Sequence, residues 1–128
     1  MDDARILVIH NNDEVVSHNT INLVSLGHKV HSVDDESMGL RLLAADPDGW
    51  SLLILKQRQS SPTHNQNIID AARRASPGTP IVLVSSLSQN LARDIYEDVA
   101  AIVEWPYDAR QLALVVHDVL SEGKRTAS

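Results

Sequence analysis

The stretches Leu52-Leu53-Ile54-Leu55 and Ile81-Val82-Leu83-Val84 are short and apolar at every position. Such runs are typical of parallel strands that helices cover on both faces. Three further apolar runs and several segments of helical period alternate with them along the chain. This alternation predicts an α/β fold, five βα units around a doubly wound parallel five-stranded sheet. The expected strands are Arg5–Ile9, Lys29–Val33, Ser51–Leu55, Ile81–Ser85 and Ala101–Val103.

Five helices are expected to connect and follow these strands. The first should begin near Asn12, a good N-cap, and stop at Gly27. The others should follow Asp35, span Asn65–Ala75, begin at Ser88 and cover the apolar stripe that ends the chain. The residues expected to face the core are Met38, Leu42, Leu43, Ile68, Ala72, Leu91, Ile95, Leu112, Val115, Val116, Val119 and Leu120.

The 128-residue length fits one domain, which we place at 1–121, followed by a polar tail at 122–128. The net charge of −6 and the scattered basic residues argue against direct binding of nucleic acid. No apolar run is long enough for a membrane span, and the acidic start lacks the pattern of a secretory signal. Cysteine is absent, so a reducing cytoplasm is compatible with the composition.

Four short motifs occur in a fixed order along the chain. They are Arg5-Ile6-Leu7-Val8-Ile9, Leu52-Leu53-Ile54-Leu55, Pro80-Ile81-Val82-Leu83-Val84-Ser85 and Trp105-Pro106-Tyr107. In this order the chain resembles, over nearly its whole length, the receiver domain of two-component response regulators and hybrid sensor kinases. The resemblance implies a flavodoxin-like sheet of order 2-1-3-4-5, with a functional pocket at the carboxyl ends of the strands.

The resemblance also implies which positions would carry chemistry. In the family, two acidic residues after the first strand and one aspartate after the third hold magnesium, and that aspartate accepts the phosphoryl group. A hydroxyl residue after the fourth strand and a lysine after the fifth respond to the arrival of the phosphoryl group. The corresponding residues of the degenerate pocket here are His10, Asn11, Lys56, Ser85 and Trp105. Only Ser85 matches the family pattern, so we expect no metal, no magnesium binding and no phosphoryl transfer.

Other interpretations of the pocket residues are weaker. Asp13 and Glu14 could replace the lost acid pair, but acidic residues are favoured in a first helical turn for dipole reasons alone. Lys56 is more simply an internal cation, paired with Asp13, Glu104 or another oxygen, than a reactive amine. Ser85 lacks the elbow motif of a hydrolase nucleophile. Trp105 either caps the altered pocket or is an exposed binding anchor, and both possibilities are open.

We therefore expect a pseudo-receiver, a module that signals through protein contacts, needs no cofactor and is not an enzyme. Its partner, another protein or a second copy, should bind the family's surface of helix 4, strand 5 and helix 5. The residues of this expected interaction face are Leu91, Ile95, Tyr96, Ile102, Tyr107, Gln111 and Leu114. A working phosphorelay receiver with atypical chemistry and a small-molecule sensor are the alternatives. By resemblance, the Trp105–Pro106 bond should be cis.

Overall fold

The computed structural model describes residues 4–10, 18, 23–56, 62–85, 99–104 and 108–127, and it has five parallel strands in one sheet. The order β2-β1-β3-β4-β5 is the one expected from the sequence. The strands are β1 Arg5–Ile9, β2 Lys29–Val33, β3 Leu52–Lys56, β4 Ile81–Ser85 and β5 Ala101–Glu104. The helices with assigned bounds are α2 Glu36–Ala45, α3 Pro62–Ala75 and α5 Ala109–Ala127.

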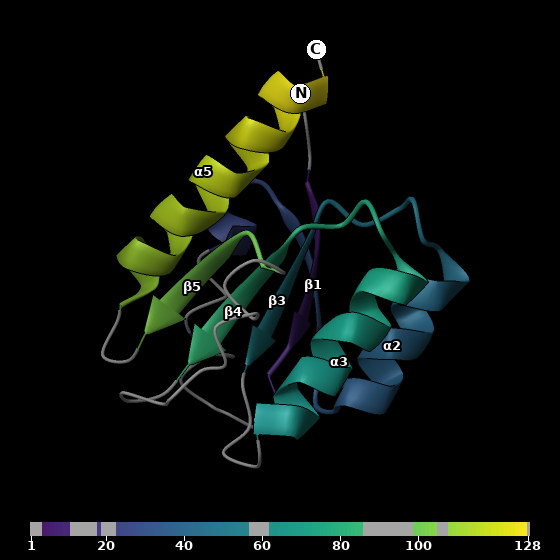
Figure 1. Cartoon of the computed structure of the whole chain (residues 1–128). Helices are drawn as coiled ribbons and strands as arrows, with labels where there is room; N and C mark the ends of the chain where they lie inside the picture. Colours follow the sequence, from purple (N-terminus) through teal and green to yellow (C-terminus); the bar gives the residue numbers. More distant parts are fainter. Residues whose placement is uncertain are drawn as a thin grey trace.

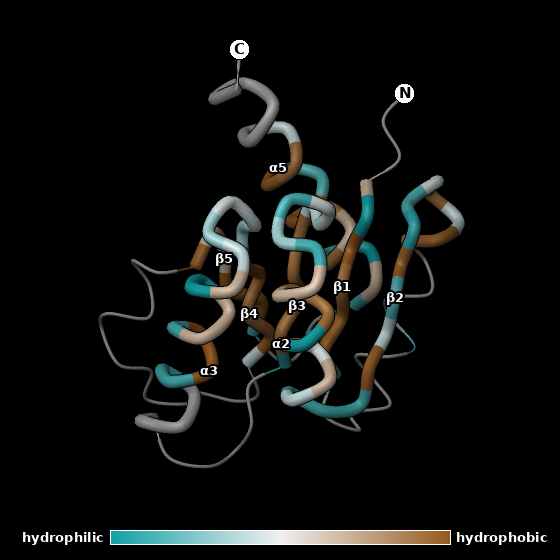
Figure 2. The backbone as a smooth tube through the Cα atoms, turned by 90° about the vertical axis from the view of Figure 1, so that its right-hand side faces the viewer, coloured by the Kyte–Doolittle hydropathy of each residue, from teal (hydrophilic) through white to brown (hydrophobic). Residues whose placement is uncertain are grey.

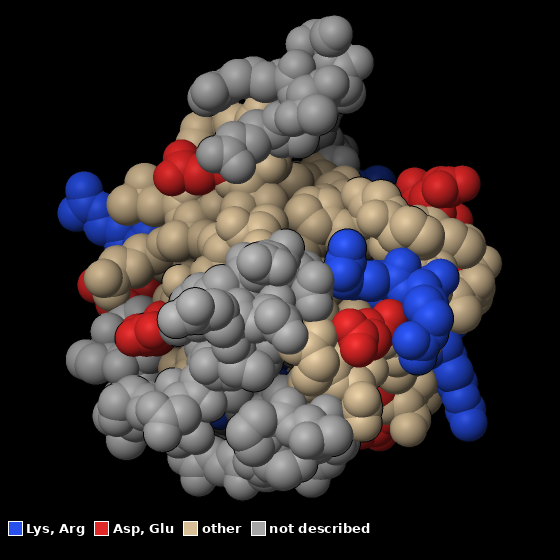
Figure 3. Space-filling view, in the orientation of Figure 1, with Lys and Arg blue, Asp and Glu red and all other residues tan. Residues whose placement is uncertain are grey.

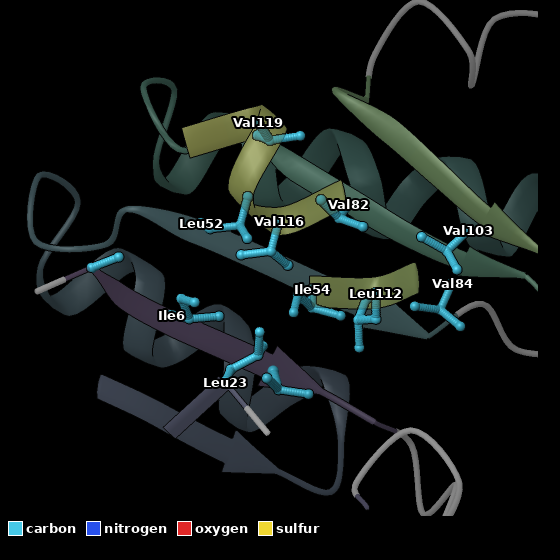
Figure 4. Packing of buried hydrophobic residues seen from close by; sticks show 12 residues of the cluster. Ile6, Leu23, Leu52, Ile54, Val82, Val84, Val103, Leu112, Val116 and Val119 are labelled. Atoms are coloured by element: carbon cyan, nitrogen blue, oxygen red, sulfur yellow. The ribbon is translucent and has the colours of Figure 1, made fainter. Parts of the chain in front are cut away.

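Helices cover both faces of the sheet, with α5 on one side and α2 and α3 on the other (Figure 1). Successive strand residues therefore alternate between two apolar clusters. The first cluster packs under α5, and Figure 4 shows its side chains meeting between that helix and the strands. Its labelled members are Ile6, Leu23, Leu52, Ile54, Val82, Val84, Val103, Leu112, Val116 and Val119. The second cluster, under α2 and α3, is Leu7, Ile9, Val33, Leu43, Trp50, Leu53, Leu55, Ile69, Ala72, Ile81 and Leu83.

Five expectations differ from the structure in detail, and the first is that β5 ends at Glu104 instead of Val103. β3 begins and ends one residue later than expected; Ser51, just before it, accepts the N–H of Arg5 with its hydroxyl and donates its own N–H to Arg5 O. α3 begins at Pro62 instead of Asn65, since proline is favoured in the first turn of a helix. Met38 is exposed, and Gly39 takes the inward position of α2. The segment expected to be a polar tail after Ser121 is helical as far as Ala127.

The helix ends follow familiar capping rules. The N–H of Gly27 donates to Val24 O and that of His28 to Leu23 O, while Gly27 has a φ of 95°. This is a Schellman motif, which glycine favours because it adopts positive φ without strain. Asp35 caps α2 by accepting the N–H of Met38 at 2.7 Å. The expected end of the first helix at Gly27 is therefore confirmed.

Trp50 makes several contacts at the amino-terminal ends of the strands. The pocket is expected at the opposite, carboxyl-terminal ends. The Nε1–H of Trp50 donates to Leu42 O at 3.1 Å, which satisfies a carbonyl in the last turn of α2. The guanidinium of Arg5 lies 4.2 Å above its ring and also pairs with Asp46 at 2.6 Å. His31 meets the same ring edge-on. These contacts join β1, β2 and the α2–β3 loop.

Candidate functional site

Three of the five pocket residues are described, and they lie at the carboxyl ends of neighbouring strands. His10 directly follows β1, Lys56 ends β3 and Ser85 ends β4. The register pairs Ile9 with Leu55, so His10 and Lys56 are the next positions along adjacent strands. Asn11 and Trp105 lie outside the described residues, as does the bond between Trp105 and Pro106.

The three side chains do not all continue the same face of the sheet. His10 continues the alternation of Ile6 and Val8, and Lys56 that of Leu52 and Ile54, both on the side of α5. Ser85 follows Ile81 and Leu83 on the side of α2 and α3 and is 3% exposed. Its Cα partner is Glu104 of β5, whereas Lys56 pairs with Val84. The imidazole of His10 and the ammonium of Lys56 thus continue one face, and the hydroxyl of Ser85 continues the other.

His10 contacts Asp34, and this contact joins the carboxyl ends of β1 and β2 beside the site. Nε2 of His10 lies 3.2 Å from Oδ1 of Asp34, which directly follows β2. The His10 backbone N–H also donates to Val33 O at 3.1 Å. Asp34 is not among the site residues expected from the sequence. The strand order would have indicated it, because β2 neighbours β1 and Asp34 is one residue beyond the pairing of Ile9 with Val33.

The described residues at this edge do not fit a magnesium ion. A hard divalent cation prefers several carboxylate and carbonyl oxygens. Here the first strand ends in an imidazole already bonded to Asp34, and the third ends in an ammonium. Within the part of the chain that the structure describes, no group of three or more acidic or histidine side chains could hold a metal. Lys56 is half-buried and has an interaction partner. The expected pairing of Lys56 with Asp13, Glu104 or another oxygen stays a prediction.

Three of the seven expected interaction residues are described. Leu114 of α5 is 57% exposed, as a contact residue should be. Gln111 is also exposed, but its side chain accepts the N–H of Asp108 at 2.9 Å while Asp108 accepts the N–H of Gln111. This reciprocal pair is a capping box at the start of α5. Ile102 packs partly against the second cluster. The other four, Leu91, Ile95, Tyr96 and Tyr107, lie outside the described residues.

Charge on the visible surface is mixed. On the face drawn in Figure 3, the described Lys and Arg side chains lie among Asp and Glu and form no extended field of one sign. Clustered positive charge is the usual mark of a nucleic-acid surface. No helix among the described residues combines the length and apolar character that a bilayer crossing requires.

Solved receiver domains share this architecture. A response regulator receiver domain protein from Clostridium thermocellum is 16% identical with a TM-score of 0.81, covering 96% of this chain and 98% of its own. A CheY-like receiver domain protein from Methanospirillum hungatei is 14% identical with a TM-score of 0.78, covering 98% and 99%. NtrX from Brucella abortus, in complex with ADP, is 20% identical with a TM-score of 0.78, covering 98% of this chain but 28% of its own. The fold is therefore that of response-regulator receiver domains.

A family comparison is more specific. The family model described as flagellar regulatory protein FleQ matches residues 5–120. Because this match spans nearly the whole chain, the protein belongs to the FleQ family. A search of curated proteins finds no match. The expected resemblance to receiver domains is thus confirmed by both the family and the fold.

Proposed function

We propose that this chain is a receiver-like signalling module that acts through protein contacts and independently of phosphorylation. The observation that carries the proposal is Lys56, the last residue of β3. By resemblance, this is the position where receiver domains keep the carboxylate that accepts the phosphoryl group. An ammonium cannot form an acyl phosphate, so the acceptor itself is missing.

Lys56 also opposes the cation on which phosphoryl transfer depends. Near a protein surface two unit charges roughly 4 Å apart interact by about 4 kcal/mol, and a divalent ion doubles the repulsion. On the neighbouring strand, His10 contacts Asp34 and supplies an imidazole instead of a negatively charged carboxylate. Electrostatic stabilisation by the metal is the main catalytic contribution in such transfers. The proposal therefore rests on the loss of both the nucleophile and its metal.

The biological assignment follows from the family. FleQ is described as a flagellar regulatory protein, and we infer that this chain serves flagellar regulation as a non-enzymatic module in the cytoplasm. In NtrX, the segment similar to this chain makes up 28% of a longer chain, so a domain of this fold can be one part of a larger protein. The exposed side chain of Leu114 supports contact through the face that includes α5.

Intact-mass measurement after incubation with acetyl phosphate and magnesium tests the proposal. We expect the wild-type chain to keep its mass, and a receiver domain with all three family carboxylates to gain one phosphoryl group under the same conditions. The triple variant His10→Asp, Asn11→Asp, Lys56→Asp should gain the adduct, whereas Lys56→Asp alone should not. Circular dichroism confirms that each variant is folded. A phosphoryl adduct on the wild-type chain would reject the proposal in favour of a working receiver.

A further inference from the structure

Among the residues that the structure describes, β2 forms a free edge of the sheet. In the order β2-β1-β3-β4-β5 it pairs only with β1. Figure 2 shows β2 at the side of the sheet, with its turn from the preceding helix beside its upper end. Lys29, His31 and Ser32 are all exposed on this strand. An edge strand of this kind is a template for pairing with another strand.

The hydrogen bonds of β2 show which backbone groups face away from β1. The N–H of Lys29 donates to Ala4 O at 2.8 Å, and Val33 O accepts from the N–H of His10 at 3.1 Å. In a parallel pair, the N–H and C=O of one residue point to the same side, and this side alternates along the strand. Lys29, His31 and Val33 therefore face β1, and Val30 and Ser32 direct both backbone groups outward. Neither has a hydrogen-bond partner among the described residues.

The charges at the two ends of β2 are opposite in sign. Lys29 lies at its amino end, and Asp34 and Asp35 directly follow its carboxyl end. Two copies of this strand in antiparallel orientation place the basic end of each beside the acidic end of the other. A parallel arrangement places like charges together. Opposite charges across paired strands are favourable and like charges are not, so the strand is complementary to itself in the antiparallel sense.

Exposed apolar side chains gather around the same strand. Among the described residues, four large hydrophobic side chains are strongly exposed, namely Val24, Leu26, Met38 and Leu114. Val24 lies at the end of the helix that precedes β2, Leu26 lies in the turn between them, and Met38 lies in the first turn of α2. In the antiparallel arrangement, the amino end of β2, next to Leu26, lies beside the carboxyl end of β2 in the other copy. That carboxyl end leads to Met38 of the other copy. Exposed apolar surface around a free edge is a common mark of an interface.

We propose that β2 is a self-association surface that pairs antiparallel with β2 of a second copy and joins two five-stranded sheets into one. Val30 and Ser32 exchange backbone hydrogen bonds with Ser32 and Val30 of the second copy, about a two-fold axis beside His31. This register places His28 opposite Asp34 of the second copy and Lys29 diagonal to its Asp35. The surface is separate from α5 and its exposed Leu114.

The variant Ser32→Pro tests the pairing directly. Proline removes an outward N–H, while the ladder to β1 uses the groups of His31 and Val33 and stays intact. Ser32→Thr is the matched control, because it keeps the N–H at the same exposed position. Sedimentation velocity up to millimolar concentration should show a dimer for the wild type and Ser32→Thr and a monomer for Ser32→Pro. Equal melting temperatures at a dilution where all three proteins are monomeric show that the monomer fold is kept.

Amide hydrogen exchange gives a residue-resolved signature of the same pairing. With rising concentration, exchange at Val30 and Ser32 should slow at least tenfold, whereas Lys29, His31 and Val33 should be protected throughout. Leu114→Asp should leave both results unchanged. The inference is overturned by a monomeric wild type at millimolar concentration, by a dimer that survives Ser32→Pro, or by a dimer that Leu114→Asp abolishes.

Discussion

Nε2 of His10 lies 3.2 Å from Oδ1 of Asp34, and the contact joins the ends of β1 and β2. The two partners differ in environment, since 11% of the His10 side chain and 71% of the Asp34 side chain are exposed. Without His10, water can solvate the exposed carboxylate. Without Asp34, a buried imidazole loses its partner, which is the more costly loss.

We therefore predict that Asp34→Ala lowers the free energy of unfolding by about 1–3 kcal/mol, the usual cost of an unpaired buried polar group. Asp34→Asn, which still offers an accepting oxygen, should cost less. Urea denaturation measures both, with Asp48→Ala as a control at another exposed aspartate. In the double variant with His10→Ala, the cost of losing Asp34 should largely disappear. Additive effects would show that the contact contributes nothing.

Gly39 marks the closest approach of α2 to the sheet. A Cβ at this position would lie 2.3 Å from Cδ1 and 2.5 Å from Cγ1 of the buried Ile9 side chain. Overpacking of this kind costs about 1–3 kcal/mol, more than the roughly 1 kcal/mol that alanine gains over glycine in a helix. Gly39→Ala should therefore lower stability in thermal and urea unfolding.

A shorter side chain at residue 9 should relieve the same overlap. The double variant Gly39→Ala, Ile9→Ala should be less destabilised than the sum of the two single variants. Gly78→Ala is the control, since a Cβ there meets nothing within 4 Å. A Gly39→Ala variant as stable as the wild type would mean that the helix shifts freely over β1.

Trp50 gives a third stability prediction. Trp50→Phe removes the donor to Leu42 O and leaves a cavity at a side chain that is 6% exposed. We expect a loss of about 1–3 kcal/mol in urea unfolding. Arg5→Met is the comparison, because the exposed pair of Arg5 with Asp46 should contribute no more than about 1 kcal/mol. A larger effect for Arg5→Met would make the cation the main stabilising element.

The strands were predictable from the sequence because both faces of a parallel sheet are buried, and this gives uniformly apolar runs such as Leu52–Leu55. The strand order came from the family resemblance. Details set by single contacts were not predictable. One such detail is the exposure of Met38, which follows from the packing of Gly39 on Ile9.

The positions of the site residues were likewise predictable, but their individual contacts were not. Lys56 and Ser85 follow apolar strands, so their place at the sheet edge could be expected. Asp34 was missed as the partner of His10, because the two residues are far apart in sequence and only the pairing of β1 with β2 indicates their contact. Trp50 was overlooked because a single tryptophan in a loop has no periodic pattern.

The α5 surface provides a functional prediction. Arg110 and Leu114 are exposed on this helix. Charge reversal in Arg110→Glu, or Leu114→Asp, should weaken capture of protein partners from cell extract, since loss of an apolar or arginine anchor typically reduces binding. Arg74→Glu, on the exposed side of α3, is the control. If both α5 variants capture partners as well as the wild type, the contact surface lies elsewhere.

Magnesium titration followed by amide chemical shifts tests the electrostatic basis of the proposed function. Lys56 supplies a positive charge and His10 is bonded to Asp34, so we expect no saturable shift at His10, Lys56 or Ser85 up to millimolar magnesium. Lys56→Asp alone should behave similarly, because one carboxylate rarely holds this ion. Addition of His10→Asp and Asn11→Asp should produce saturable shifts at these strand ends. Saturable movement in the wild-type chain would instead show a working metal site and return the protein to the class of phosphorylated receivers.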